Sequence, residues 1–116
     1  MIRTKEDVKS TRKPAPFNGI GEITVRDLLE GPAEMYEKGR VFGHTTVYPG
    51  SKIGYHVHKG DSETYYILSG TAKLSDNGKE TILHAGDVAF TGDGEGHSLE
   101  CVGDEPVEMI ALILYH

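Results

Sequence analysis

The sequence predicts an all-β protein, either a sandwich or a barrel, with almost no helix. Short runs rich in β-branched and aromatic residues recur about every 8–12 residues, the spacing typical of such folds. Clusters of Gly, Pro, Asn, Asp and Ser separate the runs, as tight turns do. Glycine makes up 15 of the 116 residues, roughly twice its ordinary share of about 7%, and shows no collagen-like period.

Length, charge and cysteine usage narrow the class of protein. A chain of 116 residues makes one domain, without room for two. The net charge of −6 and the pI near 5.4 disfavour a nucleic-acid partner, which requires clustered cations. The single cysteine, Cys101, excludes an intramolecular disulfide, and we expect a buried, inert thiol. The polar start and the lack of a long apolar run predict a cytoplasmic protein without a membrane segment.

The first half of the chain reads as an arm followed by strands. Residues 1–18 show no clear periodicity and contain a Pro-Ala-Pro sequence, so we expect an N-terminal arm with an extended segment. Residues 19–116 form the single barrel domain. Weak alternation predicts a strand over 20–29, and residues 33–38 suit one helical turn. Residues 41–48 are β-branched and aromatic, which predicts the next strand.

Turn signals divide the second half of the chain into further strands. Asp76-Asn77-Gly78 lies between two runs of strand residues, 71–75 and 79–84. An Asn-Gly pair is a strong hairpin signal, because both turn positions need a positive φ. Four more strands complete the fold, at 53–58, 63–69, 88–91 and 97–102, before the last one at 107–115.

The last strand is apolar without interruption from Met109 to Leu114. A strand that is apolar on both faces must be covered on both faces. Either the strand lies centrally with the N-terminal segment over it, or it packs against a second copy of the chain. We favour a homodimer, because one small domain has few other elements to cover that face.

Four side chains have the chemistry of metal ligands. His56 and His58 are two residues apart, so in a strand both imidazoles point to one face. Glu63 follows a turn-rich segment and can return on a neighbouring strand. His97 lies in a second glycine-rich stretch. Three imidazoles and one carboxylate suit a divalent first-row metal, namely Mn, Fe, Ni, Cu or Zn.

The spacing Gly50-x5-His56-x-His58-x4-Glu63-x6-Gly70 resembles, position for position, the first characteristic motif of the cupin superfamily. The resemblance implies a double-stranded β-helix, or jelly-roll barrel. It also implies that these two histidines and this glutamate hold a metal inside the barrel mouth.

A second stretch, Gly86-x5-Gly92-x-Gly94-x2-His97-x3-Cys101, resembles the second cupin motif with two departures. The family motif usually has proline where this chain has Gly92, and asparagine where it has Cys101. Neither departure falls on a ligand position, so the resemblance adds His97 as the fourth metal ligand. The glycine gives the loop before His97 more freedom in the unfolded chain.

Other polar residues near these motifs are candidates for lining the cavity. Tyr65 and Ile67 share the face of Glu63 by alternation, so both should line it; for Tyr65, packing and substrate contact are both open. His44 can enter the pocket as an acid or base, or fill the wall, or lie on the surface. Tyr55 should point away and serve packing.

Two functions follow from these residues and from the resemblance. The first is a metal-dependent enzyme on a small organic substrate, of the dioxygenase, sugar or sugar-phosphate isomerase, lyase or decarboxylase type that small cupins include. The alternative is a non-catalytic cupin that binds a small ligand or senses metal. We favour the enzyme, since four protein ligands leave two positions open on a six-coordinate ion. A tetrahedral zinc site with the same ligands would instead be closed.

Overall fold

The computed structural model describes residues 1–116 and consists of ten β-strands and three short 3-10 segments. This is the all-β fold expected from the sequence. None of the helical segments has the length and apolarity that a membrane-spanning helix requires. The strands are β1 (Lys9–Pro14), β2 (Glu22–Leu29), β3 (Gly39–Val47), β4 (Lys52–Val57), β5 (Asp61–Ser69), β6 (Ala72–Asp76), β7 (Lys79–Leu83), β8 (Val88–Thr91), β9 (Gly96–Cys101) and β10 (Val107–Tyr115). The 3-10 segments are η1 (Lys5–Asp7), η2 (Pro16–Asn18) and η3 (Pro32–Met35).

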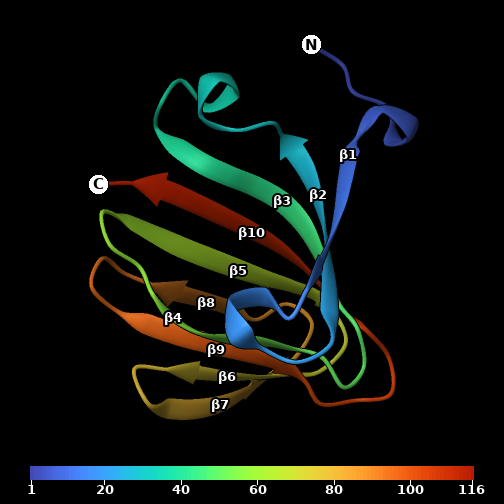
Figure 1. The fold of residues 1–116 in the computed structure, drawn as a ribbon, viewed down its shortest axis with the longest axis vertical. Coiled ribbons are helices and arrows are strands. Elements are labelled where there is room, and N and C mark those ends of the chain that lie inside the picture. The colour runs from blue at the N-terminus through green and yellow to red at the C-terminus, as the bar shows by residue number, and fades with distance from the viewer.

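Two antiparallel sheets form the two layers of a jelly-roll barrel (Figure 1). One sheet has six strands in the order β1-β2-β3-β10-β5-β8, and the other has four in the order β4-β9-β6-β7. The chain passes from β3 in the first sheet to β4 in the second and back to β5 in the first. The apolar core includes side chains from both sheets, among them Val47, Ile67, Leu74, Leu99, Val107 and Met109.

The predicted hairpin at Asn77-Gly78 is confirmed. Asn77 and Gly78 have φ values of 51° and 85°, and they join β6 to β7, where Asp76 faces Lys79. Both values lie in the left-handed region that a type I′ turn requires, which asparagine tolerates and glycine adopts freely.

Strand β10 lies in the middle of the six-stranded sheet, between β3 and β5. One of its faces, with Val107, Met109, Ala111 and Ile113, is buried. The other face, which includes Ile110 and Leu112, is only half-buried. The N-terminal segment does not lie over β10, because β1 instead extends the edge of the sheet beside β2.

The N-terminal arm contains a paired strand, whereas the sequence indicated only an extended segment there. Strand β1 pairs with β2 along its whole length, from Lys9 opposite Asp27 to Pro14 opposite Glu22. All of its residues are exposed, which explains the missing alternation of apolar and polar residues. The predicted count of nine strands is therefore one too low.

The helical turn also begins earlier than expected. Segment η3 starts at Pro32, whose fixed φ suits the first turn of a helix. It ends before Lys38, because Tyr36 and Glu37 have φ values of 52° and 60°, outside the helical region.

Candidate metal centre

Strands from both sheets bring the four predicted ligands to one point inside the barrel. His56 lies in β4 and His58 one residue beyond the end of that strand. His97 lies in β9, directly opposite His56 in the register of the two strands. Glu63 comes from β5 in the other sheet. The turn between His58 and Glu63 therefore carries the chain from one layer to the other, as the turn-rich sequence indicates.

The donor atoms of these residues lie at ligand-to-ligand spacing. His97 Nε2 is 3.0 Å from His56 Nε2 and 3.1 Å from His58 Nε2. Glu63 Oε1 is 3.2 Å from His58 Nε2 and 3.1 Å from His97 Nε2. All four donors lie within 4.8 Å of one another. His58, Glu63 and His97 are buried, and His56 is half-buried.

A second set of contacts orients the three imidazoles. His56 Nδ1 donates to the Gly54 carbonyl at 2.8 Å. His58 Nδ1 faces Asp61 Oδ1 at 2.8 Å, and Asp61 Oδ2 in turn accepts from Arg40 Nε at 3.0 Å. Partners of this kind fix the tautomer and the ring orientation of metal-binding histidines.

Thr91 is the polar partner that orients the imidazole of His97. Its Oγ1 lies 2.9 Å from His97 Nδ1, and both side chains are buried. Each of the three Nδ1 atoms therefore has a polar partner, while each Nε2 atom points at the centre of the cluster.

This arrangement needs positive charge at its centre. The Nδ1 atoms of His56 and His58 face oxygen acceptors and carry the proton, so in the neutral ring each Nε2 presents a lone pair. Glu63 adds a carboxylate oxygen at the same point. Several lone pairs within about 3 Å repel one another unless a proton or a metal ion lies between them. Without a metal, protons on the imidazoles bridge to Glu63, and a first-row divalent metal, which this donor set suits, would replace them. The His56, His58, Glu63 and His97 cluster thus fits a metal site.

The charges of the cluster act on one another through short contacts. Burial opposes ionisation of Glu63, but hydrogen bonds from His58 and His97 outweigh it and lower its pKa to about 2. A hydrogen bond to Glu63, opposed by burial and helped by Asp61, raises the pKa of His58. Burial lowers the pKa of His56. Glu63 is therefore an anion at neutral pH, as a metal ligand must be.

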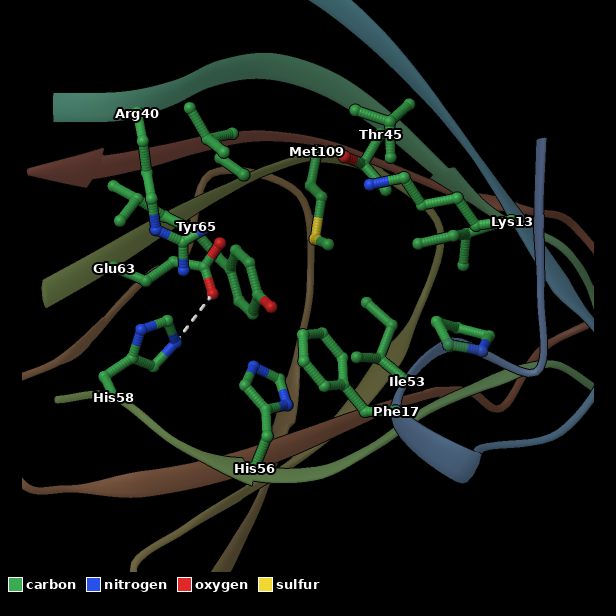
Figure 2. A pocket seen from close by; sticks show the side chains of 16 residues that line it. Lys13, Phe17, Arg40, Thr45, Ile53, His56, His58, Glu63, Tyr65 and Met109 are labelled. Atoms are coloured by element: carbon green, nitrogen blue, oxygen red, sulfur yellow. Dashed lines mark ion pairs between the residues drawn. The ribbon is translucent and has the colours of Figure 1, made fainter. Parts of the chain in front are cut away.

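A small pocket of about 130 Å³ opens beside the cluster (Figure 2). His56, His58 and Glu63 stand in its wall together with Tyr65. The remaining wall is largely apolar, with Pro16, Ile23, Val25, Val41, Ile53, Met109, Ala111 and Ile113. One water molecule needs about 10–15 Å³ of cavity volume, so the pocket holds on the order of ten non-hydrogen atoms. Its size suits a small organic molecule.

Aromatic rings enclose the histidines from two sides. The Tyr65 ring stacks on His97 with 5.1 Å between centroids, and the Phe17 ring stacks on His56 at 3.9 Å. Burial and the nearby Glu63 carboxylate raise the pKa of the Tyr65 phenol well above its ordinary value. Tyr65 therefore stays neutral and donates a proton only reluctantly.

The other predicted residues divide between the pocket and its surroundings. Tyr65 lines the pocket as expected, whereas Ile67 is fully buried in the core and takes no part in the wall. His44 is outside the pocket lining, and its Nε2 lies 2.9 Å from Glu108 Oε1. Tyr55 points away from the pocket, as its position next to His56 indicates, but it is 54% exposed and is not packed in the core as expected. Cys101 is buried and its Sγ lies 3.2 Å from the Glu105 carbonyl oxygen.

Sequence reasoning missed the residues that support the ligands. Asp61 lies three residues after His58, and this spacing of a carboxylate and a histidine was a usable signal. Thr91 and Arg40 carry no local pattern that marks them. Phe17 reaches the site from the predicted arm, and only the folded chain reveals that contact.

The family assignment follows from a direct match. Residues 43–113 match the family model described as "Cupin domain", which covers more than half of the chain. The chain belongs to the cupin family, as the two motifs indicated.

The chain is also similar to individual proteins of this family. The chain is 44% identical over 114 residues to the "Oxalate-binding protein" of Thermotoga maritima, covering 98% of this chain and 93% of that protein. The crystal structure of a predicted oxalate decarboxylase from the same organism has a TM-score of 0.94 and 37% identity, with full coverage of both chains. A sugar phosphate isomerase of the cupin superfamily from Silicibacter pomeroyi shares the fold, with a TM-score of 0.74, 18% identity, and coverage of all of this chain and 76% of that one.

Proposed function

We propose that this cupin binds one divalent transition metal through His56, His58, Glu63 and His97, and uses it to bind a small carboxylate in the barrel mouth. The observation that carries the proposal is the inward direction of all three Nε2 atoms, each ring being held from behind through Nδ1. A divalent ion would supply a positive charge and open coordination positions for an anionic oxygen.

The spacing of the donors favours a six-coordinate ion over a closed tetrahedral one. Ligand atoms about 2.1 Å from an ion are about 3.0 Å apart at right angles and about 3.4 Å apart at the tetrahedral angle. The four short donor separations are 3.0–3.2 Å. Four protein ligands then leave two positions for the carboxylate, and three of the four ligands lie in the pocket wall.

Similarity to the Thermotoga maritima "Oxalate-binding protein" supports a small organic acid, such as oxalate, as the ligand class. We favour binding without turnover, which reverses the preference for an enzyme drawn from the sequence, because no uncommitted acid–base group lines the pocket beside the metal cluster. Glu63 is committed to the metal, Arg40 is paired with Asp61, and the phenol of Tyr65 has a raised pKa.

A metal-dependent enzyme is the second candidate. The open positions favour it, since a metal that binds a carboxylate can also polarise it for decarboxylation or bind dioxygen beside it. Similarity to a predicted oxalate decarboxylase of known structure supports the same class.

Elemental analysis and calorimetry of the purified protein test the proposal. We expect about one transition metal ion per chain, and oxalate binding that disappears when the metal is removed and returns when it is restored. Oxalate binding of equal strength with and without metal would contradict the proposal. Consumption of bound oxalate, followed by carbon dioxide release or oxygen uptake, would select the enzyme.

The proposal includes a homodimer formed through the outer face of the six-stranded sheet. Adjacent strands β10, β5 and β8 expose large apolar side chains on this face: Tyr66, Leu68, Val88, Phe90 and Leu114 are 41–62% exposed. Contiguous apolar patches are uncommon on monomers and mark interaction sites. We expect a dimer by light scattering and a monomer for Phe90→Glu, with Ile82→Glu on the other sheet as the matched control.

A further inference from the structure

The end of the pocket that lies away from the metal cluster carries an unpaired cation. Lys13 lines the pocket from β1, where it faces Ile23. Figure 2 shows it at the opposite end from His58 and Glu63, with its side chain directed inward toward Thr45 and Met109. None of the ion pairs in the structure involves Lys13.

The strand that carries Lys13 is anchored at its end by a close backbone contact. Segment η2 packs on β4 so tightly that a Cβ on Gly54 would lie 2.0 Å from the Phe17 carbonyl oxygen. A Cβ on Gly19 would lie 1.9 Å from the Lys52 carbonyl oxygen. Phe17 itself has a φ of 52° and stacks on His56. The backbone next to Lys13 is therefore held at the pocket mouth, although the strand has no buried face.

The charges along the pocket leave an excess of two positive units. A divalent metal is half neutralised by Glu63, and Asp61 balances Arg40 at 3.0 Å. Lys13 adds its own uncompensated charge at the far end. Lys13 is exposed at the pocket opening, so its attraction for an anion is Coulombic and partly screened by solvent. A ligand with two negative charges, one at each end, matches this distribution of charge.

The wall between the two charged ends is apolar. In Figure 2, Met109 lies between the metal cluster and Lys13, and Ile53, Val25 and Val41 belong to the same lining. An apolar middle suits methylene groups better than polar atoms. The pocket volume of about 130 Å³ is on the scale of about ten non-hydrogen atoms, close to the size of succinate or glutarate.

We infer that the pocket accommodates an extended dicarboxylate, whose first carboxylate lies at the metal and whose second meets the Lys13 ammonium at the other end. The inference rests on the proposed function and deepens it, because it gives the ligand a second anchoring point. Oxalate is too short to use both points and would be held at the metal end alone.

Binding of three acids to the metal-loaded protein tests this role of Lys13. Glutarate carries both charges, pentanoate replaces the second carboxylate with a methyl group, and oxalate occupies only the metal end. Lys13→Gln removes the charge, and Lys9→Gln is the matched control, since Lys9 lies on the same strand face but outside the pocket lining. Calorimetry gives the dissociation constants, and thermal unfolding verifies that each variant is folded.

An ion pair with an exposed ammonium predicts that the native protein binds glutarate about threefold to fivefold more tightly than pentanoate. In Lys13→Gln this preference should fall to within about twofold, whereas Lys9→Gln should keep it. Oxalate binding should weaken less than glutarate binding in Lys13→Gln, because oxalate is held at the metal end. Equal affinity for glutarate and pentanoate in the native protein, or an equal loss in both variants, would overturn the inference while leaving the metal site intact. Absence of metal-dependent binding of all three acids would overturn the proposed function as well.

Discussion

The two ends of the pocket are built in different ways. At the metal end, each histidine has a hydrogen-bonding partner at Nδ1 and three of the four ligands are buried. At the other end, Lys13 and Phe17 come from a segment whose strand is exposed throughout. The strands of the barrel therefore form the metal end, whereas the N-terminal segment determines the shape of the pocket opening. Changes at the first end should therefore alter metal binding far more than changes at the second.

Removing a buried ligand should have the largest effect. His97→Ala deletes a side chain that is 1% exposed and lies next to three other donors, so we expect metal affinity to fall by roughly a thousandfold or more. Metal content of the purified variant, measured by elemental analysis, tests this. His84→Ala, which changes an exposed histidine away from the cluster, should retain the metal.

Loss of a supporting carboxylate should have an intermediate effect. Asp61→Asn keeps the size of the side chain but weakens its contacts with His58 and Arg40. Removing such partners typically lowers metal affinity by about 10–100-fold. Competition with a chelator measures the change, and Asp104→Asn in an exposed turn serves as the control. Unchanged affinity in Asp61→Asn would mean that the barrel alone orients His58.

Acid should weaken metal binding through His58. Its pKa in the metal-free protein is raised above the ordinary 6.5, so the proton persists to higher pH than on a free histidine. Above the raised pKa the metal displaces no proton from His58. Below it each binding event releases one, and affinity should fall by about tenfold per pH unit. Glu63, with a pKa of about 2, adds nothing to this slope near neutrality. Metal affinity should be measured between pH 5 and 8, a span of about three units around the ordinary histidine pKa. The plot of log affinity against pH should change slope at the pKa of His58.

A change at the pocket opening should have the smallest effect on the metal. Phe17→Ala removes the ring stacked on His56, a contact worth about 0.5–1.5 kcal/mol. Because the Gly54 carbonyl still holds His56 Nδ1, we expect metal affinity to fall less than about tenfold. The same chelator competition measures it, with Phe17→Leu as the conservative comparison. A loss of metal affinity as large as that expected for His97→Ala would contradict the proposed difference between the metal end and the opening of the pocket.

Local patterns in the sequence were sufficient to predict the barrel and the convergence of the four candidate ligands, but not the pocket opening. The four ligands have fixed spacing along the chain, and the hairpin at Asn77-Gly78 has its own turn chemistry. The alternation of β10 was hidden, because apolar residues also occupy its outer face. Strand β1 has no apolar face at all, so no periodicity marks it.

Contacts between distant segments explain what the sequence left open. Phe17 contacts His56 although the two residues are 39 positions apart in the sequence. Thr91 is only six residues from His97, but its contact depends on the conformation of the loop between β8 and β9. His44 lies on β3 but forms a contact with Glu108 rather than with the cavity. Which face of β3 a residue occupies depends on the register with β10, and this register follows from the whole barrel.

The origin of the ligands in two different layers has a mechanical consequence. Glu63 belongs to the six-stranded sheet, while His56 and His97 belong to the four-stranded one. A single ion held by all of these residues would cross-link the two sheets at this end of the barrel. Loading the protein with metal should therefore slow amide exchange in β4, β5 and β9 more than in the distant β6–β7 hairpin.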